Sequence, residues 1–346
     1  MSLIDVLYIE KDALGLPFSR KIRAKLPSAT VVPIDRWEDV FYRKKQNFAL
    51  QKKDQNLIVG INRGGFVMQG SDNCQSTGAD VFAYCSFAKN CIAGCGYCYL
   101  QGMMRSGNLL AFANMEDCFG EVRGLLERER ISENRKLLLA VSYDNDIYAL
   151  EGLFGYIGMW SDFVDAEQRE GLTVEIRTKC GTRQFVDHAK PSNGSLVFTW
   201  SVSSPENIKK YEPMTSDLKA RLDAAAYAVK KGFRVRLALD PVLDVSEGPG
   251  GYVKLCEEIR ARNIGEKLDA VMLGGFRIPA DYLKIMRKNA PSSPIAFDSY
   301  EVREGTACYA PEREKKLTDL IAGNLVKTAG VPGERIFILD REAAKG

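Results

Sequence analysis

The run CIAGCGYCYLQ, residues 91–101, carries three cysteines in the spacing C-x3-C-x2-C and no fourth. Cys91, Cys95 and Cys98 can therefore surround one point with thiolates, which are soft ligands that suit iron–sulfur clusters, copper(I) or zinc. A structural zinc site normally has four protein ligands, and an ordinary [4Fe–4S] cluster is held by four cysteines. A set of three thus predicts a [4Fe–4S] cubane with one iron left open for an outside ligand.

Two less specific interpretations of the run remain open. Zinc would need Cys74 or Cys85 as a fourth ligand, because the only histidine, His188, lies far away in sequence. The three cysteines could also share a loop without a common role. A non-catalytic structural protein that binds an iron–sulfur cluster or zinc therefore remains an alternative.

Outward from this run, strand-like and helical segments alternate along the chain. The apolar, strand-like runs begin near Val81, Leu137, Thr173, Leu196, Arg234 and Ala270. Segments with helical periodicity lie between them, at 115–129, 149–167, 217–232, 251–263 and 280–290, and the connection at 183–190 is short. Alternating strands and helices predict an α/β fold with a parallel sheet. Six repeats are too few for a closed eightfold barrel, so we predict a partial (β/α)6 barrel.

The same pattern predicts three parts of the chain. Residues 1–78 form a small N-terminal α/β unit, and residues 79–290 form the partial barrel with the cysteine run. Residues 291–346 form a C-terminal extension, in which a helix follows Pro311 and a strand ends the chain at RIFILD.

Composition predicts a globular protein of the reducing cytoplasm. Nine cysteines, an odd number, and no signal-peptide pattern in the first residues argue against a disulfide framework. No apolar run reaches the length of a membrane span, so we expect no membrane partner. The net charge of +3 does not indicate a nucleic-acid partner by itself. The basic runs at 43–45 and 52–53 could contact phosphates, but we interpret them as a solvated helix face.

Polar residues follow the predicted strands where a barrel would carry its active site. In parallel barrels this site is built by the loops at the carboxyl ends of the strands. The cysteine run follows the first regular strand, and the polar or small residues after the others are Ser142, Asp144, Asn145, Lys179, Ser201, Ser203, Ser204, Asp240, Gly274, Gly275 and Arg277. We expect these residues to form one rim.

The chain resembles the radical S-adenosylmethionine (radical SAM) enzymes, in which the residue before the last cysteine is usually aromatic, as Tyr97 is here. Within them it resembles the spore photoproduct lyase family, which repairs a thymine dimer in spore DNA. The likeness covers most of the chain, and its most specific pieces are GCGYCYLQ and YEPMTS. Further pieces are LYIEKDALGLPFSRKI, DIYALEGL, TVEIRTK, FTWSVSS and the stretch from YEPMTS to KKGF.

The resemblance implies a binding site for the cluster and for SAM. Cys91, Cys95 and Cys98 would hold the cluster, and Lys179 would bind the carboxylate of SAM. The residues that would contact the rest of SAM are Ser201 or Ser203 on their strand, and Ser142, Asp144, Asn145 and Asp146 near its amino group.

It also implies residues near the reacting centre. Tyr97 and Tyr99 flank the last cysteine, where tyrosines of the family lie. The family keeps a hydrogen-donating cysteine at the end of its second barrel strand, but here Ser142 or Tyr143 stands there. A serine O–H bond is too strong to donate hydrogen readily to a carbon radical, whereas a tyrosine O–H could do so. Cys308 is a substitute donor or a structural thiol.

The C-terminal hairpin with which the family grips DNA is a second departure. A DNA-gripping hairpin should be basic and aromatic. Here the stretch SYEVREGTACYAPERE is several residues shorter and carries Glu301, Glu304 and Glu312. This departure weakens the expectation of DNA repair and leaves the expectation of radical chemistry unchanged.

The resemblance implies a lyase-like enzyme with two cofactors, a [4Fe–4S] cluster and S-adenosyl-L-methionine. Reductive cleavage of SAM would give a 5′-deoxyadenosyl radical that abstracts hydrogen from a thymine lesion in DNA or from a related nucleotide. The electron would come from a one-electron reductant, a flavodoxin or a ferredoxin. The alternative is a paralogue with the same radical chemistry on a nucleoside, a small metabolite or a peptide.

Overall fold

The computed structural model describes residues 4–70, 77–191, 194–245 and 248–339, so Cys74 lies outside the described residues. Its main body is a curled sheet in the order β16-β12-β11-β10-β9-β8-β5-β4, parallel except for β4. The strands are β4 (Val67–Gln69), β5 (Val81–Cys85), β8 (Leu137–Ala140), β9 (Leu172–Thr178), β10 (Leu196–Ser201), β11 (Arg234–Val242), β12 (Ala270–Gly275) and β16 (Ile336–Ile338). All six predicted strands are present, and the predicted partial barrel is confirmed.

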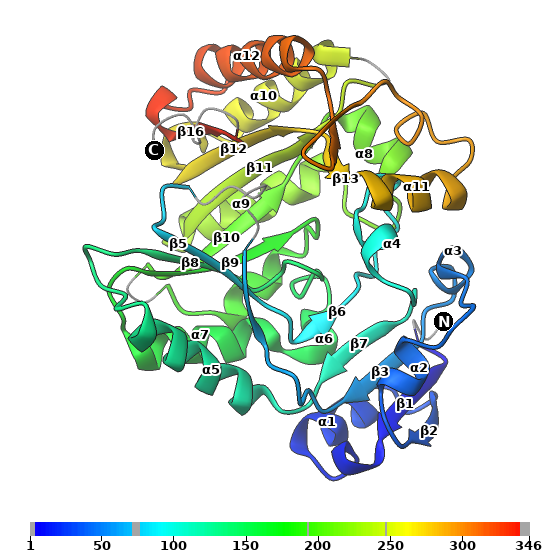
Figure 1. Ribbon diagram of the computed structural model, residues 1–346. Coiled ribbons are helices and arrows are strands. Elements are labelled where there is room, and N and C mark those ends of the chain that lie inside the picture. Colours follow the sequence, from blue (N-terminus) through cyan, green and yellow to red (C-terminus); the bar gives the residue numbers. More distant parts are fainter. Residues whose placement is uncertain (1–3, 71–76, 192–193, 246–247, 340–346) are drawn as a thin grey trace.

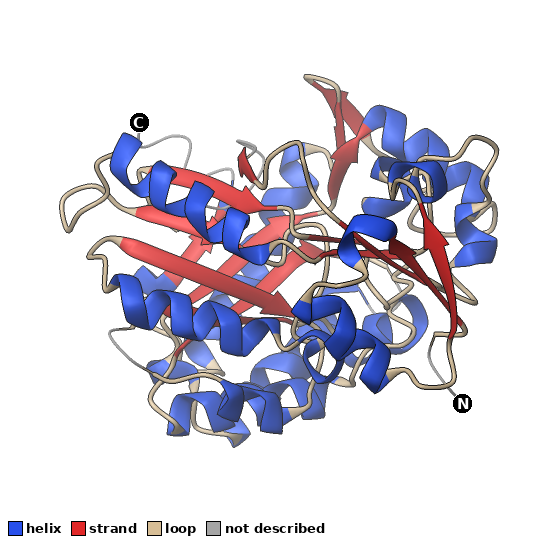
Figure 2. Cartoon of the chain, turned by 90° about the horizontal axis from the view of Figure 1, so that it is seen from below, coloured by secondary structure: helices blue, strands red, loops and turns tan. Residues whose placement is uncertain are grey.

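Helices cover the outer face of this sheet (Figures 1 and 2). They are α5 (Met115–Arg128), α7 (Tyr156–Glu167), α9 (Leu218–Lys230), α10 (Gly251–Ala261) and α12 (Pro311–Lys327). Three further helices of the chain are α6 (Glu151–Phe154), α8 (Pro205–Tyr211) and α11 (Ala280–Asn289). The strands β8 and β10 are buried along their whole length, as expected for parallel strands covered on both faces. The short connection at 183–190 is a 3-10 helix, Arg183–His188.

The predicted helix at 149–167 is divided in two. Gly155 separates α6 from α7 and has a positive φ of 74°, a left-handed conformation that glycine adopts without steric cost. Helical periodicity continues across the break, because both short helices bury apolar residues against the same core. The pattern therefore predicted the buried face correctly and missed the turn.

A second sheet, in the order β2-β1-β3-β7-β6, contains the N-terminal residues. Its strands are β1 (Val6–Glu10), β2 (Thr30–Ile34), β3 (Leu57–Gly60), β6 (Ala88–Lys89) and β7 (Leu109–Phe112), and its short helices are α1 (Pro17–Lys25), α2 (Glu38–Phe41) and α3 (Phe48–Gln51). The strands β6 and β7 come from the segment predicted to belong to the barrel. Between these two strands the chain forms the cysteine run and the short helix α4 (Leu100–Met103). Both ends of the cysteine loop are therefore attached to the second sheet.

The C-terminal residues form a small antiparallel sheet in the order β13-β15-β14. The strands are β13 (Arg277–Pro279), β14 (Glu301–Arg303) and β15 (Thr306–Cys308), and a two-residue turn at Glu304 and Gly305, both with positive φ, joins the last two. Next to this sheet, α11 packs on α4, with Tyr282 against Gly102. Figure 1 shows α4, α8, α11 and β13 gathered on one side of the molecule.

Among the helices of the described residues, none combines the length and the apolar character that crossing a membrane requires.

Candidate active site

The three cysteines of the run lie in the loop between β6 and α4, and all three thiols are free. Cys95 is buried, while Cys91 and Cys98 are partly exposed. Cys95 interacts electrostatically with both of the others, so the three side chains surround a common region. Burial raises the pKa of the Cys95 thiol to about 11, and the nearby Lys179 opposes this rise. Lys179 alone does not keep Cys95 ionised near neutral pH, so a bound metal would have to stabilise the Cys95 thiolate.

Lys52, just after α3, reaches into this loop from the N-terminal unit. Its ammonium donates a hydrogen bond to the carbonyl oxygen of Cys91, and the Gln55 amide donates to the same oxygen at 3.2 Å. Gln55 also donates to the carbonyl oxygen of Gly107 at 2.6 Å, beyond the end of the loop. The interpretation of this basic run as a solvated helix face is wrong for Lys52, which is partly buried, whereas Lys53 is exposed.

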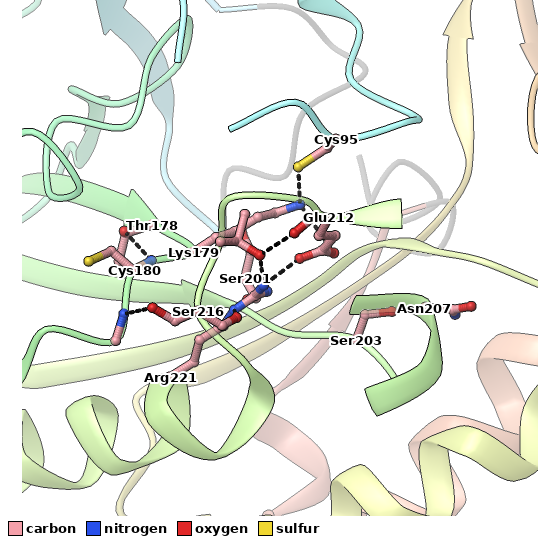
Figure 3. A network of polar contacts seen from close by, with 12 residues as sticks. Cys95, Thr178, Lys179, Cys180, Ser201, Ser203, Asn207, Glu212, Ser216 and Arg221 are labelled. Atoms are coloured by element: carbon pink, nitrogen blue, oxygen red, sulfur yellow. Dashed lines mark hydrogen bonds and ion pairs between the residues drawn. The ribbon is translucent and has the colours of Figure 1, made fainter. Parts of the chain in front are cut away.

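Lys179, directly after β9, reaches the loop from the barrel (Figure 3). Its ammonium lies 3.7 Å from the sulfur of Cys95 and 3.3 Å from a carboxylate oxygen of Glu212. It also donates to the Tyr97 hydroxyl and lies 4.4 Å from the centre of the Tyr97 ring. The placement beside the cysteine loop fits the predicted role of Lys179, but its contact with Glu212 is new.

Glu212 links Lys179 to a second cation. Its carboxylate accepts a hydrogen bond from Arg221 at 2.6 Å and another from the Tyr97 hydroxyl. Burial would raise the pKa of Glu212, but Lys179 and Arg221 hold it below its ordinary value, so the group remains a carboxylate. Burial would likewise lower the pKa of Lys179, but Cys95 and Glu212 more than offset this, and the pKa is raised. The group of Lys179, Glu212 and Arg221 therefore carries a net positive charge beside the thiols.

The residues after β8 lie next to the strand that leads into the cysteine loop. Asp144 accepts hydrogen bonds from Ser86 at 2.6 Å and from Lys89 at 3.4 Å, and Asn145 donates to the carbonyl oxygen of Ala88 at 2.9 Å. Burial raises the pKa of Asp144, and Lys89 opposes the rise. The side-chain oxygen of Asn145 is buried and has no hydrogen-bond partner among the described residues. It is thus an acceptor available to a ligand's ammonium group.

Two other residues of this segment are already bonded within the protein. Asp146 accepts from the Thr178 hydroxyl at 2.8 Å and from the backbone N–H of Lys179 at 3.0 Å, so it orients the end of β9. The Ser142 hydroxyl accepts from the backbone N–H of Arg177 at 3.2 Å. Both contacts tie β8 to β9 at the rim.

Ser201 and Ser203 are both buried at the end of β10. The carbonyl oxygen of Ser201 accepts from Arg221 at 2.9 Å, and the Ser203 hydroxyl lies 3.5 Å from the Tyr252 hydroxyl. Ser204 is the N-cap of α8, and its hydroxyl accepts from the backbone N–H of Asn207 at 3.3 Å. These contacts do not distinguish Ser201 from Ser203 as a ligand of SAM.

The tyrosines predicted near the reacting centre lie at two places beside the loop. Tyr97 belongs to the Lys179 and Glu212 network. Tyr99 donates to the carbonyl oxygen of Tyr143, and the Tyr143 ring stacks on that of Tyr84 at 4.2 Å between centroids. The aromatic group of Tyr84, Tyr99 and Tyr143 therefore connects the cysteine loop to the ends of β5 and β8.

Cys308 lies on the hairpin, buried, and its sulfur accepts from Arg303 at 3.2 Å. It is the register partner of Arg277, whose guanidinium binds both oxygens of Asp240 at 2.7 and 3.2 Å. Gly274 leaves room for this ion pair, since an added Cβ would lie 2.7 Å from Arg277 Nη1. Of the predicted rim, Asp240, Gly274 and Arg277 thus form a group of their own.

The residues of the loop fit a cluster better than a single metal ion. In the described part of the chain, no three cysteine, histidine or acidic side chains lie close enough together to hold one ion. A cubane places each thiolate on a different iron, so its three sulfurs need not converge on one atom. Cys85, a fourth ligand in the zinc interpretation, has its thiol hydrogen-bonded to Cys118 instead.

Sequence reasoning missed several residues of this site, among them Glu212, Arg221 and Lys52. Glu212 lies within YEPMTS, which was identified as a specific match without a role for its carboxylate. Lys52 lies in a basic run whose composition resembles that of a solvated surface. A lysine amid apolar and amide residues, as in FALQKKDQNL, carries no local signal of its contact with Cys91.

Comparison with known proteins gives one family. The family model for spore photoproduct lyase matches residues 3–310. The spore photoproduct lyase of Geobacillus sp. (strain Y412MC61) is 24% identical over 306 residues, which cover 85% of this chain and 84% of the relative. That of Bacillus subtilis (strain 168) is 25% identical over 320 residues, covering 86% and 85%.

Solved structures of spore photoproduct lyase share the fold. One, complexed with dinucleoside spore photoproduct, superimposes with a TM-score of 0.81 at 19% identity and covers 97% of this chain and 98% of its own. A mutant with bound AdoMet (SAM) and dinucleoside spore photoproduct gives a TM-score of 0.79 at 20% identity, with the same coverage. The family match extends over most of the sequence, and the likeness of fold extends over nearly all of it. The chain belongs to the spore photoproduct lyase family of radical SAM enzymes.

Proposed function

We propose that this enzyme holds a [4Fe–4S] cluster on Cys91, Cys95 and Cys98 and uses SAM to abstract hydrogen from a thymine lesion in DNA or from a related nucleotide. The observation that carries the proposal is the position of Lys179, whose ammonium lies 3.7 Å from the Cys95 sulfur although the two residues are 84 positions apart in sequence. When bound, the cluster and SAM supply the 5′-deoxyadenosyl radical. A one-electron reductant, a flavodoxin or a ferredoxin, would donate the electron.

The residues of the chain bind and orient SAM in this proposal. The Lys179 ammonium forms a charge-assisted contact with its carboxylate. Glu212 and Tyr97 fix the position of that ammonium, and Asn145 presents a buried acceptor to the amino group of SAM. Asp144 adds a buried negative charge near the same point.

Return of a hydrogen atom to the product is assigned to the tyrosines. Ser142 or Tyr143 follows β8 where the family keeps a cysteine, and of the two only the tyrosine O–H could donate hydrogen; Tyr99 bonds to the backbone of Tyr143. Tyr97 is less suited to this role, because its hydroxyl is engaged by Lys179 and Glu212. Cys308 belongs to the hairpin and contacts Arg303, so we assign it to packing.

One observation favours a second substrate class. The exposed end of the hairpin carries Glu301 and Glu304, and carboxylates there repel DNA phosphates. The alternative function is the same radical chemistry on a nucleoside, a small metabolite or a peptide. Both functions require the same cofactor site and differ only in what the hairpin covers.

An anaerobic assay separates these functions. The reconstituted protein is incubated with SAM and dithionite, with and without spore-photoproduct dinucleotide, and 5′-deoxyadenosine and thymidylyl-thymidine are measured. Both products together support lesion repair. Deoxyadenosine without thymidylyl-thymidine supports the alternative, and no deoxyadenosine from a fully loaded cluster contradicts the proposed function. The Cys95→Ala variant is the control for cluster-independent turnover.

A further inference from the structure

We propose that Lys52 is a redox-tuning residue, whose positive charge raises the reduction potential of the cluster held by the cysteine loop. This inference rests on the proposed function, because it requires the cluster. It assigns to the N-terminal unit a part in electron uptake, besides its contribution to the fold.

The Lys52 ammonium lies against the backbone of the cysteine loop. It donates a hydrogen bond to the backbone carbonyl of Cys91, 39 residues away in sequence. It also interacts electrostatically with the side chains of Cys91, Cys95 and Cys98 together. A single ammonium therefore faces the whole set of thiols from the side of the second sheet.

The two lysines beside the thiols, Lys52 and Lys179, differ in how far a carboxylate offsets their charge. The charge of Lys179 is partly offset by Glu212 at 3.3 Å, a carboxylate that Lys179 shares with Arg221. Lys52 forms no ion pair with a carboxylate in the part of the chain that the structure describes, and the charged groups that act on it are the three cysteines. Because it is partly buried, its field is screened by solvent less than that of a surface lysine. Lys52 is thus the less compensated of the two cations.

A positive charge beside an iron–sulfur cluster changes how readily the cluster is reduced. The potential of an iron–sulfur cluster depends on its net charge, its hydrogen bonds and its exposure to solvent. Reduction adds one negative charge to a group already surrounded by thiolates, so a fixed cation nearby stabilises the reduced form. Removing the charge of Lys52 should therefore make the cluster harder to reduce.

Gln55 makes it possible to distinguish the effect of the Lys52 charge from the effect of the cysteine loop's geometry. Gln55 donates to the same carbonyl oxygen of Cys91, but it carries no charge. Removing Gln55 loosens the loop and leaves the ammonium in place. Lys53, exposed and adjacent in sequence, provides a matched control for the loss of a lysine.

The experiment is a redox titration of the reconstituted protein without SAM, followed by the electron paramagnetic resonance signal of the reduced cluster. At a fixed ambient potential, the ratio of reduced to oxidised cluster should fall at least tenfold in Lys52→Gln, which equals 59 mV for a one-electron couple. Lys52→Arg, Lys53→Gln and Gln55→Ala should each stay within threefold of the wild type.

Three results would overturn the inference. The first is an unchanged potential in Lys52→Gln. The second is a shift of the same size in Lys52→Arg or Gln55→Ala, which would assign the effect to loop geometry. The third is a folded Lys52→Gln protein, checked by circular dichroism, that cannot be loaded with iron, because the lysine would then act in assembly. A wild-type protein without any cluster signal would contradict the proposed function itself, before any variant is compared.

Discussion

The cofactor side and the hairpin side of the rim each contain a pair of arginine and carboxylate, fully buried on the cofactor side and partly buried on the hairpin side, and the two pairs differ in the charge that remains unbalanced. On the cofactor side, Glu212 is shared between Lys179 and Arg221, so positive charge remains beside the thiols. On the hairpin side, Arg277 binds both oxygens of Asp240, and Glu301 and Glu304 are exposed beyond it. On the cofactor side the excess positive charge can attract an anionic group of a ligand. On the hairpin side the charges of Arg277 and Asp240 offset each other.

Loss of a cysteine on the cofactor side should have the largest effect. Cys95→Ala removes one of three thiolates from a cluster that has no fourth protein ligand in the run. The variant should lose the brown chromophore and all cleavage of SAM, measured by absorption and by 5′-deoxyadenosine. Cys256→Ala, a buried cysteine of α10, is the control and should retain both. A Cys95→Ala protein with a full chromophore would contradict the cluster assignment.

Loss of Lys179 should affect binding of SAM and leave the cluster in place. A hydrogen bond to a charged group contributes about 1.5–3 kcal/mol, so Lys179→Ala should raise the dissociation constant for SAM roughly ten- to a hundredfold. Anaerobic equilibrium binding with the loaded protein measures this. Lys209→Ala, which removes an exposed lysine of α8, should leave the constant unchanged. Equal affinities of Lys179→Ala and wild type would exclude the predicted contact with SAM.

On the hairpin side, Asp240→Asn should reduce stability more than cofactor affinity. The substitution removes the negative charge that faces Arg277, and breaking such a pair costs about 3–5 kcal/mol when it is fully buried, so a smaller loss is expected for this partly buried pair. Arg277 and Arg177 hold the pKa of Asp240 below its ordinary value, against the effect of burial. The carboxylate therefore stabilises the fold above about pH 4, the ordinary pKa of aspartate, and this contribution is lost as the pH falls through the lowered pKa.

Urea unfolding of the metal-free protein at several pH values tests this. The difference in free energy of unfolding between wild type and Asp240→Asn should be largest near neutral pH and should shrink below pH 4. Asp281→Asn, an exposed aspartate paired with Lys284, should change stability by less than about 0.5 kcal/mol. A difference that does not depend on pH would refute the ion pair as its source.

Reversal of the exposed charge on the hairpin should have a smaller effect, on DNA affinity. A double variant, Glu301→Lys with Glu304→Lys, should bind a thymine-containing oligonucleotide about tenfold more tightly at low salt, with a steeper dependence on salt. Fluorescence anisotropy measures both. The control reverses two exposed glutamates elsewhere, Glu266 and Glu334. An equal gain in the control would show that total charge, and not the hairpin, determines the affinity.

The smallest effect is expected for Cys308→Ala. The thiol is buried against Arg303 and the hairpin backbone, so its loss should cost about 1 kcal/mol of stability. Cleavage of SAM and the products formed from the substrate should be unchanged, as measured by chromatography. If the substrate radical were instead diverted to other products, Cys308 would be a hydrogen donor, and the hairpin side would take part in the chemistry.

The sequence predicted what depends on local spacing and periodicity. Three cysteines within eight residues predict a cluster loop, and alternating apolar strands and amphipathic helices predict the parallel barrel that the structure has. The position of Lys179 after β9 was also predictable, because the carboxyl ends of parallel strands meet at one edge. The roles of Ser201, Ser203 and the tyrosines stay predictions, since their contacts do not identify a ligand.

The rest depends on contacts between distant segments. Glu212 forms an ion pair with Lys179, 33 positions away in sequence (212 − 179). Lys52 donates a hydrogen bond to Cys91, 39 positions away in sequence. The strands β6, which has two residues, and β7 were not predicted as separate strands, and they join the loop to the N-terminal sheet. The sequence by itself determined the barrel and the placement of three cysteines in one loop, because spacing and periodicity are local. Only the tertiary structure decided which charges surround those cysteines, because electrostatic neighbours are set by packing and not by distance along the chain.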